Sequence, residues 1–223
     1  DAGWRVIATD CRSAPAAKSH AFVEADLETI ATDDKELNSF ADAVREALDG
    51  SQLCALVNNA AVQILGSVPS LTATDWERTL RINVMAPYRL AQALLPELRG
   101  ADGAIINIGS VHAQATKPEF VAYATSKSAI HGMTRAMAVD LGPRPRVLCV
   151  APAAVGTQML KDGFSDRPEA MAELAAAHPA GRIATPSEIA RSIVSLSQEP
   201  FLFSTGTTVW LDGGVLSRLH DPV

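Results

Sequence analysis

The sequence contains few of the residues from which disulfide frameworks and metal sites are built. Its three cysteines, Cys11, Cys54 and Cys149, are scattered and odd in number, and no cysteine or histidine group has the spacing of metal ligands. Cys54 and Cys149 fall in predicted strands, where a thiol usually behaves as a small apolar side chain. We therefore expect no metal centre and a reduced, cytoplasmic setting.

Positive charge and long apolar runs are also scarce. The net charge is -6 and the pI is about 5.3, which argues against a nucleic-acid or anionic-membrane partner. No apolar stretch approaches the length needed to cross a bilayer, and residues 1–4 show no signal-peptide pattern. We therefore expect neither nucleic acid nor a membrane among the partners.

Hydrophobic residues, by contrast, are plentiful and periodic. They make up 48% of the 223 residues, enough for one domain with a sizeable core. Short apolar runs alternate with segments of helical periodicity. The predicted strands cover 4–10, 22–25, 53–58, 103–109, 146–151 and 207–211, and the predicted helices cover 33–48, 74–98 (kinked at Pro87), 121–141, 167–178 and 186–198. This alternation predicts an α/β fold in which residues 1–223 form a single domain around a parallel sheet covered on both faces.

The stretch Tyr123-Ala124-Thr125-Ser126-Lys127 opens the helix predicted over 121–141. Residues four apart lie on one helical face, so the Tyr123 phenol and the Lys127 ammonium should be neighbours. A free phenol has a pKa of about 10, too high for easy proton exchange at neutral pH, and a nearby cation lowers that pKa. We therefore predict an acid/base pair.

A serine is expected beside this pair. The apolar run 104–108 predicts a buried parallel strand that ends in Gly109 and Ser110, and ligands of open α/β sheets bind outside the carboxyl ends of the strands. A hydroxyl there can hold a substrate oxygen while Tyr123 exchanges a proton with it. Alone the Tyr/Lys spacing is weak, because it also occurs by chance on many solvated helices.

In combination, the motifs resemble the short-chain dehydrogenase/reductase family, in its compact single-domain branch. The resemblance runs from Trp4 to Gly214 and includes, in order, the turn Asn58-Asn59-Ala60-Ala61, Asn83 in a long helix, Ser110, the Tyr123/Lys127 pair, Pro152 with Thr157, and the closing Leu211-Asp212-Gly213-Gly214. It implies a doubly wound, Rossmann-like sheet and an NAD(P)-dependent oxidoreductase that interconverts a secondary alcohol and a ketone by hydride transfer. It also implies a homotetramer or homodimer, with helices 74–98 and 121–141 as contact surfaces.

The resemblance implies a role for each matched residue. Tyr123 exchanges the proton, Ser110 orients the reacting oxygen, Lys127 also holds the nicotinamide ribose, and Asn83 holds a water in a proton relay. The implied cofactor-binding residues are Asp10, Asp26, Leu27, Asn58, Ala60, Tyr123, Lys127, Pro152, Val155 and Thr157. The ordinary alternatives are a surface Tyr/Lys pair, a strand-end serine, a helical asparagine and loop aspartates.

Asp10, at the end of the strand predicted over 4–10, favours NAD over NADP. A carboxylate in that place hydrogen-bonds the ribose hydroxyls and would repel a 2'-phosphate. Arg12 weakens this preference, because an arginine there can accept the phosphate, and a turn role for Asp10 is the alternative. Ala153 stands where the family usually has glycine, so its methyl group could restrict the backbone after Pro152.

A glycine-rich turn is absent from the sequence. A dinucleotide fold begins with a strand, such a turn and a helix, roughly 30 residues, and the turn cradles the pyrophosphate. No Gly-x-Gly occurs anywhere in the chain. The first strand is central in the 3-2-1-4 order, so its loss would leave two neighbours with unpaired backbone groups. We expect the sequence to be part of a longer protein whose first segment precedes Asp1; the alternative is a truncated chain that folds marginally and binds dinucleotide poorly.

Of all the expected properties, the identity of the substrate is the one that the sequence determines least. His112, two residues after Ser110, is expected to face the pocket, together with Gln63, Glu119 and Met159. A histidine can hydrogen-bond a polyol or carboxylate, and the surroundings of Ser110 are similar to those in sugar and hydroxy-acid dehydrogenases of the family. Alternatives are a 3-oxoacyl-type reductase, a nucleotide-sugar epimerase or dehydratase, which normally has a longer chain, and a cofactor-sensing or scaffold protein without activity. The intact Asn-Ser-Tyr-Lys set argues against the last.

Overall fold

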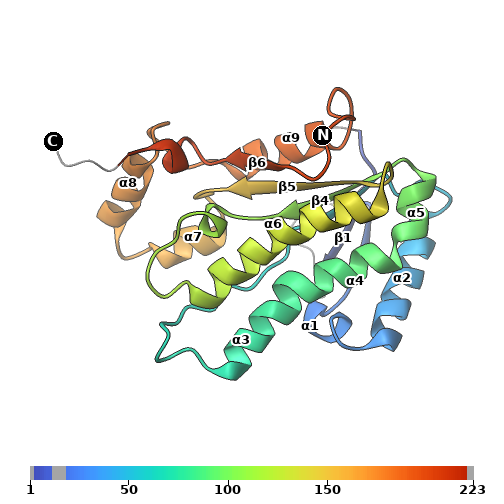
Figure 1. The fold of residues 1–223 in the computed structure, drawn as a ribbon, viewed down its shortest axis with the longest axis horizontal. Coiled ribbons are helices and arrows are strands. Elements are labelled where there is room, and N and C mark those ends of the chain that lie inside the picture. Colours follow the sequence, from blue (N-terminus) through green and yellow to red (C-terminus); the bar gives the residue numbers. More distant parts are fainter. Residues whose placement is uncertain (1–2, 12–18, 220–223) are drawn as a thin grey trace.

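Strands and helices alternate along the chain in the computed structural model, which describes residues 3–11 and 19–219 (Figure 1). The strands are β1 (Ile7–Asp10), β2 (Ala21–Glu24), β3 (Ala55–Asn58), β4 (Ala104–Ile108), β5 (Arg146–Pro152) and β6 (Thr208–Leu211). The α-helices are α1 (Leu27–Ile30), α2 (Asp34–Leu48), α3 (Ala73–Leu80), α4 (Ala86–Ala93), α5 (Leu95–Gly100), α6 (Val121–Leu141), α7 (Gln158–Gly163), α8 (Pro168–Ala177) and α9 (Pro186–Leu196). Short 3-10 turns follow at Val111–Ala113 and Val215–Ser217.

All strand pairs are parallel, but they form two sheets. β3, β4, β5 and β6 are hydrogen-bonded in that order, and β1 pairs with β2 in a separate two-stranded sheet. The predicted α/β fold with a parallel sheet is confirmed. The interruption falls between β1 and β3, where the sequence analysis places a further strand. Within the described residues no backbone hydrogen bond joins β1 to β3, and Val57 on β3 is 39% exposed.

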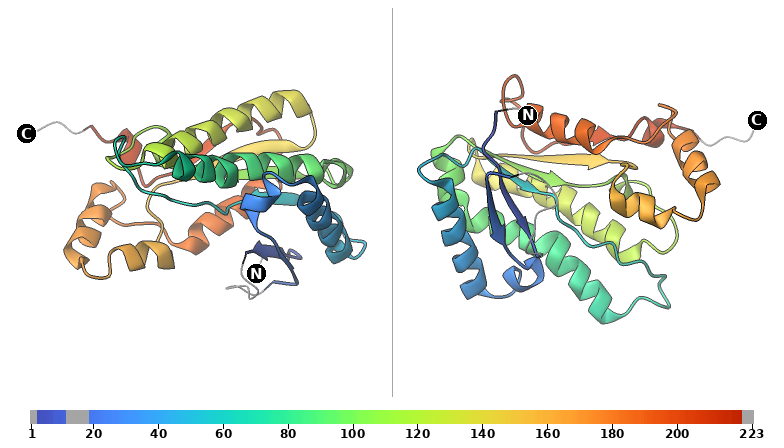
Figure 2. Two further views of the ribbon diagram at one scale, coloured as in Figure 1. Left: turned by 90° about the horizontal axis from the view of Figure 1, so that it is seen from below. Right: turned by 180° about the vertical axis from the view of Figure 1, so that it is seen from behind.

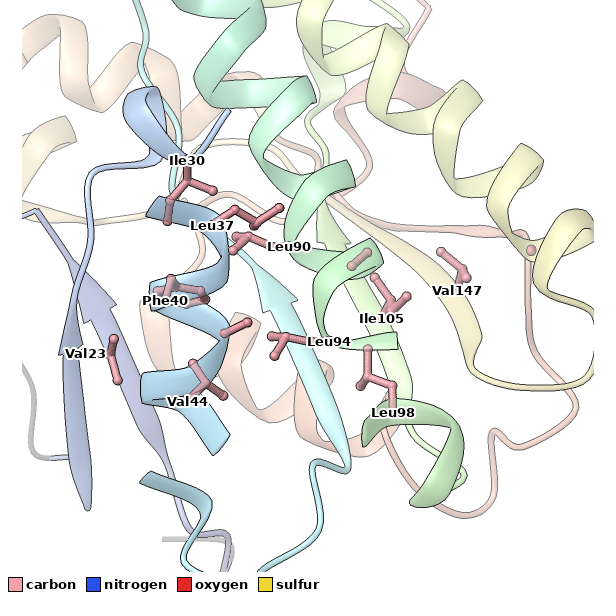
Figure 3. Close-up of a cluster of buried hydrophobic side chains, with 13 residues drawn as sticks. Val23, Ile30, Leu37, Phe40, Val44, Leu90, Leu94, Leu98, Ile105 and Val147 are labelled. Carbon is pink, nitrogen blue, oxygen red and sulfur yellow. The ribbon is translucent and has the colours of Figure 1, made fainter. Parts of the chain in front are cut away.

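Helices cover both faces of the four-stranded sheet (Figure 2). Ile105 of β4 and Val147 of β5 belong to a cluster with α2, α4, α5 and α6, whereas Ile106 and Leu148, their neighbours in sequence, belong to a second cluster with α9. This alternation follows from the two-residue repeat of a strand. Figure 3 shows the first cluster, in which α2 and α4 pack their apolar side chains together beside the sheet. Each fully buried leucine or isoleucine there contributes about 1.5–3 kcal/mol.

The helix predicted over residues 74–98 is not one helix. It consists of α3, a π turn at Arg81–Met85, α4 and α5. Pro87 has no N–H to donate to the carbonyl four residues earlier, at Asn83, and the π turn ends just before it. The helix predicted to be kinked at Pro87 is thus interrupted by a π turn just before that residue. A π turn of this kind often marks a functional site. α1 and α7 were absent from the prediction, because elements of four and six residues are too short to show a helical period.

The three cysteines are free: Cys11 is exposed, Cys54 is partly buried and Cys149 is buried. Cys149 has 0% exposure in β5, which confirms that this thiol packs as a small apolar side chain. In the part of the chain that the structure describes, no helix combines the length and the apolar character needed to span a bilayer.

Candidate active site

The candidate site lies at the carboxyl ends of the strands in the four-stranded sheet. Because these strands are parallel, Asn58 at the end of β3, Ser110 after β4 and Pro152 at the end of β5 lie along the same edge. Helix α6 packs along β4 and β5, and its first turns carry Tyr123 and Lys127. The sheet and one helix therefore bring together residues that are separated along the chain.

Ser110 and Tyr123 form the centre of this site. The Ser110 side chain lies close enough to the Tyr123 phenol to influence its pKa. Ser110 is 6% exposed, and its Oγ accepts a bond from the His112 backbone N–H at 3.2 Å. Burial raises the pKa of the Tyr123 phenol, and the Ser110 hydroxyl acts in the opposite direction, because a neighbouring donor favours the phenolate. The phenol therefore keeps its proton at neutral pH.

Lys127 is buried beside this pair. Its Nζ lies 5.6 Å from the centroid of the Tyr123 ring and donates a 2.7 Å hydrogen bond to the carbonyl of Ile108. Burial lowers the pKa of Lys127 to about 8, while Cys149 acts weakly in the opposite direction. The prediction that Lys127 lowers the pKa of the phenol is wrong for this structure, because the pKa of Tyr123 is raised. The physical reason is that the cost of burying the phenolate outweighs other effects, and the ammonium bonds to a carbonyl instead.

Asn83 ties the π turn to two other parts of the site. Its Oδ1 accepts from Val62 N at 2.8 Å, and its Nδ2 donates to Val62 O at 2.9 Å and to Ser126 Oγ at 3.0 Å. The side chain is 2% exposed, and both amide hydrogens and one oxygen lone pair are engaged in protein contacts. Its direct contribution is therefore to position α6. A water relay at Asn83 stays a prediction.

A chain of buried amides connects the strands below the site. Asn58 Nδ2 donates to Asn107 Oδ1 at 2.8 Å, and Asn107 Nδ2 donates to Thr134 Oγ1 on α6 at 3.0 Å. The prediction that asparagine amides tie neighbouring strands together is confirmed. Asn107 was missed, although a single amide inside the apolar run 104–108 was a signal for it. Asn58 Oδ1 is buried without a protein partner.

The predicted adenosine-side residues lie at the ends of β1, β2 and β3. Asp10 is exposed at the carboxyl end of β1. Asp26 caps α1, where its carboxylate accepts bonds from Glu28 N at 2.9 Å and from Thr29 Oγ1 at 3.3 Å. Leu27 packs against the first core cluster, and Ala60 is exposed just after β3. Their roles in cofactor binding stay predictions, and Arg12 lies outside the described residues.

The predicted carboxamide-side segment continues from β5. Val155 forms a parallel bridge with Ala184, and Thr157 caps α7 by accepting a backbone N–H, so its own hydroxyl proton can be donated elsewhere. The alanine after Pro152 is not strained, because Ala153 is not among the residues with positive φ. The concern that its methyl group restricts the backbone is therefore removed.

Of the residues predicted to contact substrate, His112 lies beside Tyr123, whereas Gln63 and Glu119 are exposed. The His112 ring stacks on Phe120 with centroids 4.4 Å apart and meets the Tyr123 ring edge-on at 5.8 Å. This places His112 beside the Tyr123 phenol, while its role toward substrate stays a prediction. Gln63 and Glu119 are exposed, and Glu119 has a φ of 71°, in the left-handed region that glycine favours. Met159 lies in α7, but its side chain is outside the described part.

Behind Lys127 lies a close contact that the sequence analysis missed. A Cβ added to Gly109 would stand 2.4 Å from His131 Nε2 and 2.6 Å from Cys149 Sγ. His131 is 8% exposed and follows Lys127 by one helical turn. The missing side chain at position 109 therefore lets α6 approach the end of β4, directly before Ser110. A glycine at the end of a buried strand was the available signal for such an approach.

Replacing Gly109 by Ala is expected to lower the free energy of unfolding by about 1–3 kcal/mol, because the new methyl group overlaps two buried side chains. Turnover should fall as well, since Ser110 shifts relative to Tyr123. The matched control is Gly132→Ala on α6, where the nearest atom is 4.0 Å away and alanine should be neutral or stabilising by up to about 1 kcal/mol. Urea unfolding measures both variants, and equal stabilities would contradict the packing argument.

Nearly the whole chain is similar in sequence to known proteins. Residues 1–216 match the family model described as enoyl-(acyl carrier protein) reductase. Protein FixR of Bradyrhizobium diazoefficiens is 36% identical over 226 residues, which cover 96% of this chain and 78% of that protein. Two further relatives are the 2-(S)-hydroxypropyl-CoM dehydrogenase 3 of Xanthobacter autotrophicus, at 36% identity, and the dehydrogenase/reductase SDR family member 4 of Homo sapiens, at 35% identity. The chain aligns with 66% and 60% of their lengths, respectively.

Solved structures share the fold of this chain. The aldohexose dehydrogenase (AldT) of Thermoplasma acidophilum, in ligand-free form, has a TM-score of 0.89 at 26% identity over 98% of this chain and 87% of that one. A gluconate 5-dehydrogenase from Burkholderia cenocepacia, in complex with NADP and tartrate, has a TM-score of 0.79 at 25% identity over 89% of this chain and 76% of that one. The chain therefore belongs to the short-chain dehydrogenase/reductase family, whose NAD(P)-dependent oxidoreductases act on alcohols and ketones.

Proposed function

We propose that the chain interconverts a secondary alcohol and a ketone by hydride transfer, with Tyr123 as the proton-exchanging residue, Ser110 as the group that orients the reacting oxygen, and Lys127 as the residue that holds the nicotinamide ribose. The observation that carries this proposal is the gathering of the buried Ser110, the Tyr123 phenol on whose pKa it acts and the Lys127 ammonium, 5.6 Å from the Tyr123 ring centroid, at the carboxyl end of β4. A bound nicotinamide cofactor would supply the hydride donor or acceptor, and the protein would supply orientation and proton transfer.

The protonation of the Tyr123 phenol suggests how the proton moves in each direction of the reaction. During reduction, Tyr123 donates its proton to the ketone oxygen while Ser110 holds the same oxygen. Because burial raises the pKa of Tyr123, the phenol is already in the protonated form that this direction needs. During oxidation, Tyr123 must first lose that proton and then accept one from the substrate hydroxyl, so this direction should gain from higher pH.

The residues present fit a dinucleotide, and we propose NAD as the preferred form. Asp10 is exposed at the carboxyl end of β1, where a carboxylate suits two ribose hydroxyls better than a phosphate. At the other end, the Thr157 hydroxyl can donate to a carboxamide, because its oxygen already caps α7. NADP is the second candidate, since the gluconate 5-dehydrogenase structure contains it.

A sugar or hydroxy acid is the proposed substrate class. His112 beside Tyr123 offers a hydrogen-bonding group for a polar substrate, and the two structural relatives are a sugar dehydrogenase and a sugar-acid dehydrogenase by name. A 3-oxoacyl-type reductase is a further candidate, supported by the description of the matching family model. The second candidate function is a cofactor-sensing or scaffold protein of the same fold without turnover.

A substrate panel tests this proposal. Sugars, polyols, hydroxy acids, steroids and 3-oxoacyl thioesters are assayed with NAD(H) and NADP(H), following the ultraviolet absorbance of the reduced nicotinamide. We expect turnover of a polar secondary alcohol, with a higher kcat/KM for NAD than for NADP. Nicotinamide-cofactor binding without turnover of any compound would favour the sensing function instead.

We further propose a homodimer or homotetramer formed through the helices from α3 to α4 and through α6. Large apolar side chains on these helices are exposed: Met85 by 48%, Tyr88 by 44% and Val139 by 84%. Contact between subunits along these helices would remove these side chains from water. A cytoplasmic location is also proposed, supported by the three free cysteines.

A further inference from the structure

An unassigned cation lies beside the aromatic side of the proposed site. Lys117 Nζ is 4.7 Å from the centroid of the Phe120 ring, and that ring is 6.0 Å from the Tyr123 ring, which it meets edge-on. Phe120 is buried at 8% exposure, so its ring has a fixed position. A cation–π contact of this kind restrains an otherwise flexible lysine. The ammonium is thus held one aromatic ring away from the reacting phenol.

Lys117 is available for an anionic partner. It belongs to none of the ion pairs formed within the described residues, and Glu119, two positions later, is exposed and likewise unpaired there. The other lysine of the site, Lys127, is committed to the Ile108 carbonyl. The chain as a whole carries a net charge of -6 and repels anions at long range. A local positive charge is therefore needed wherever an anionic substrate is to bind.

His112 does not supply that positive charge. Burial and the neighbouring Lys117 lower the pKa of His112 to about 4, so its imidazole is neutral at physiological pH. Its Nδ1 is hydrogen-bonded to Thr116 Oγ1 at 2.9 Å, and its ring stacks on Phe120. His112 can therefore offer a neutral hydrogen bond, whereas Lys117 carries the charge on this side of the site.

We propose that Lys117 is a specificity-determining residue that selects substrates with a carboxylate a few carbons away from the reacting carbinol. This inference rests on the proposed function, which places the carbinol at Ser110 and Tyr123. The contacts of Lys117 with Phe120 and of Phe120 with Tyr123 bring the ammonium within reach of a carboxylate that a short carbon chain joins to a carbinol held at Ser110 and Tyr123. Hydroxy acids with two to four carbons between the two groups are favoured over neutral alcohols of the same shape.

Binding of matched acids and amides tests the inference independently of turnover. The probes are 3-hydroxybutyrate, 4-hydroxypentanoate and 5-hydroxyhexanoate, each paired with its primary amide, which has nearly the same shape but no charge. Isothermal titration calorimetry compares the wild type with Lys117→Gln, with the charge-conserving Lys117→Arg, and with Lys35→Gln, an exposed lysine at the start of α2 as the matched control. All are surface substitutions that should leave the fold intact.

We expect the wild type and Lys35→Gln to bind at least one acid about tenfold more tightly than its amide, in line with a partly screened ion pair. Lys117→Gln should lose this preference, with amide binding within about twofold of wild type, and Lys117→Arg should keep most of it. Equal binding of acids and amides by the wild type, or an unchanged preference in Lys117→Gln, overturns the inference. Turnover measured on the same samples tests the dehydrogenase proposal separately. An active enzyme that binds acids and amides equally well would refute only the role of Lys117.

Discussion

Replacing Tyr123 by Phe is expected to reduce turnover about a thousandfold, within the range that general acid/base catalysis contributes. The substitution removes one oxygen and keeps the ring that packs against His112 and Phe120. Cofactor binding and the unfolding midpoint should therefore change little. The measurement is kcat with the best substrate of the panel, together with titration of the reduced cofactor by fluorescence.

The matched control for this prediction is Tyr88→Phe, because Tyr88 is the other tyrosine of the chain and is 44% exposed on α4. It should retain wild-type turnover. In the wild type, the rate of alcohol oxidation should rise with pH above neutrality, because burial raises the pKa of Tyr123 and oxidation needs the phenolate. An oxidation rate that is as high in Tyr123→Phe as in the wild type would end the proposed mechanism.

Replacing Lys127 by Met should inactivate the protein and also stabilise it. Loss of a preorganised charge at the reacting centre should cost about a hundredfold or more in kcat. The fold, however, no longer has to bury an ammonium, which is worth on the order of 3 kcal/mol, while the lost hydrogen bond to the Ile108 carbonyl offsets about 1 kcal/mol of this. The free energy of unfolding should therefore rise by about 2 kcal/mol at neutral pH.

The pH dependence of this stabilisation provides the sharper measurement. The pKa of Lys127 is lowered from 10.5 to about 8 by burial, so between these values the unfolded chain binds more protons than the folded one. Stability of the wild type therefore rises across this window. The advantage of Lys127→Met should be complete below pH 8 and disappear before pH 10.5, because the lost hydrogen bond to Ile108 still counts against the variant when the cost of burying the ammonium has gone. Urea unfolding at several pH values tests this, with exposed Lys35→Met as control; a variant less stable than wild type at pH 7 would contradict it.

The sequence predicted the architecture well because the apolar pattern fixes it. The run 104–108 became β4, whose residues are buried, and residues 121–141 became α6 with the predicted limits. The long helix over 74–98 was wrong in detail. Hydrophobic periodicity continues across a π turn, whereas the break depends on a backbone bond that Pro87 cannot make.

The candidate site was predicted only as far as residue types and spacing allow. Tyr123 and Lys127 were expected to be neighbours because helical geometry is local, and the strand-end position of Ser110 followed from the parallel sheet. The pKa of Tyr123 was predicted in the wrong direction, because burial depends on everything packed around the phenol. For the close approach at Gly109, the sequence signals only a strand-end glycine; its partners, His131 and Cys149, could not be identified, since they lie on elements distant along the chain.

By itself, the sequence determined the order of strands and helices, the edge of the sheet at which polar groups gather, and the membership of a family. Those properties follow from periodicities of two and 3.6 residues and from short motifs, which each stretch of chain carries alone. Only the tertiary structure decided which groups are buried, which keep a free charge, and how closely α6 approaches β4. Desolvation and steric contact are sums over neighbours from several elements, so they exist only after those elements have packed.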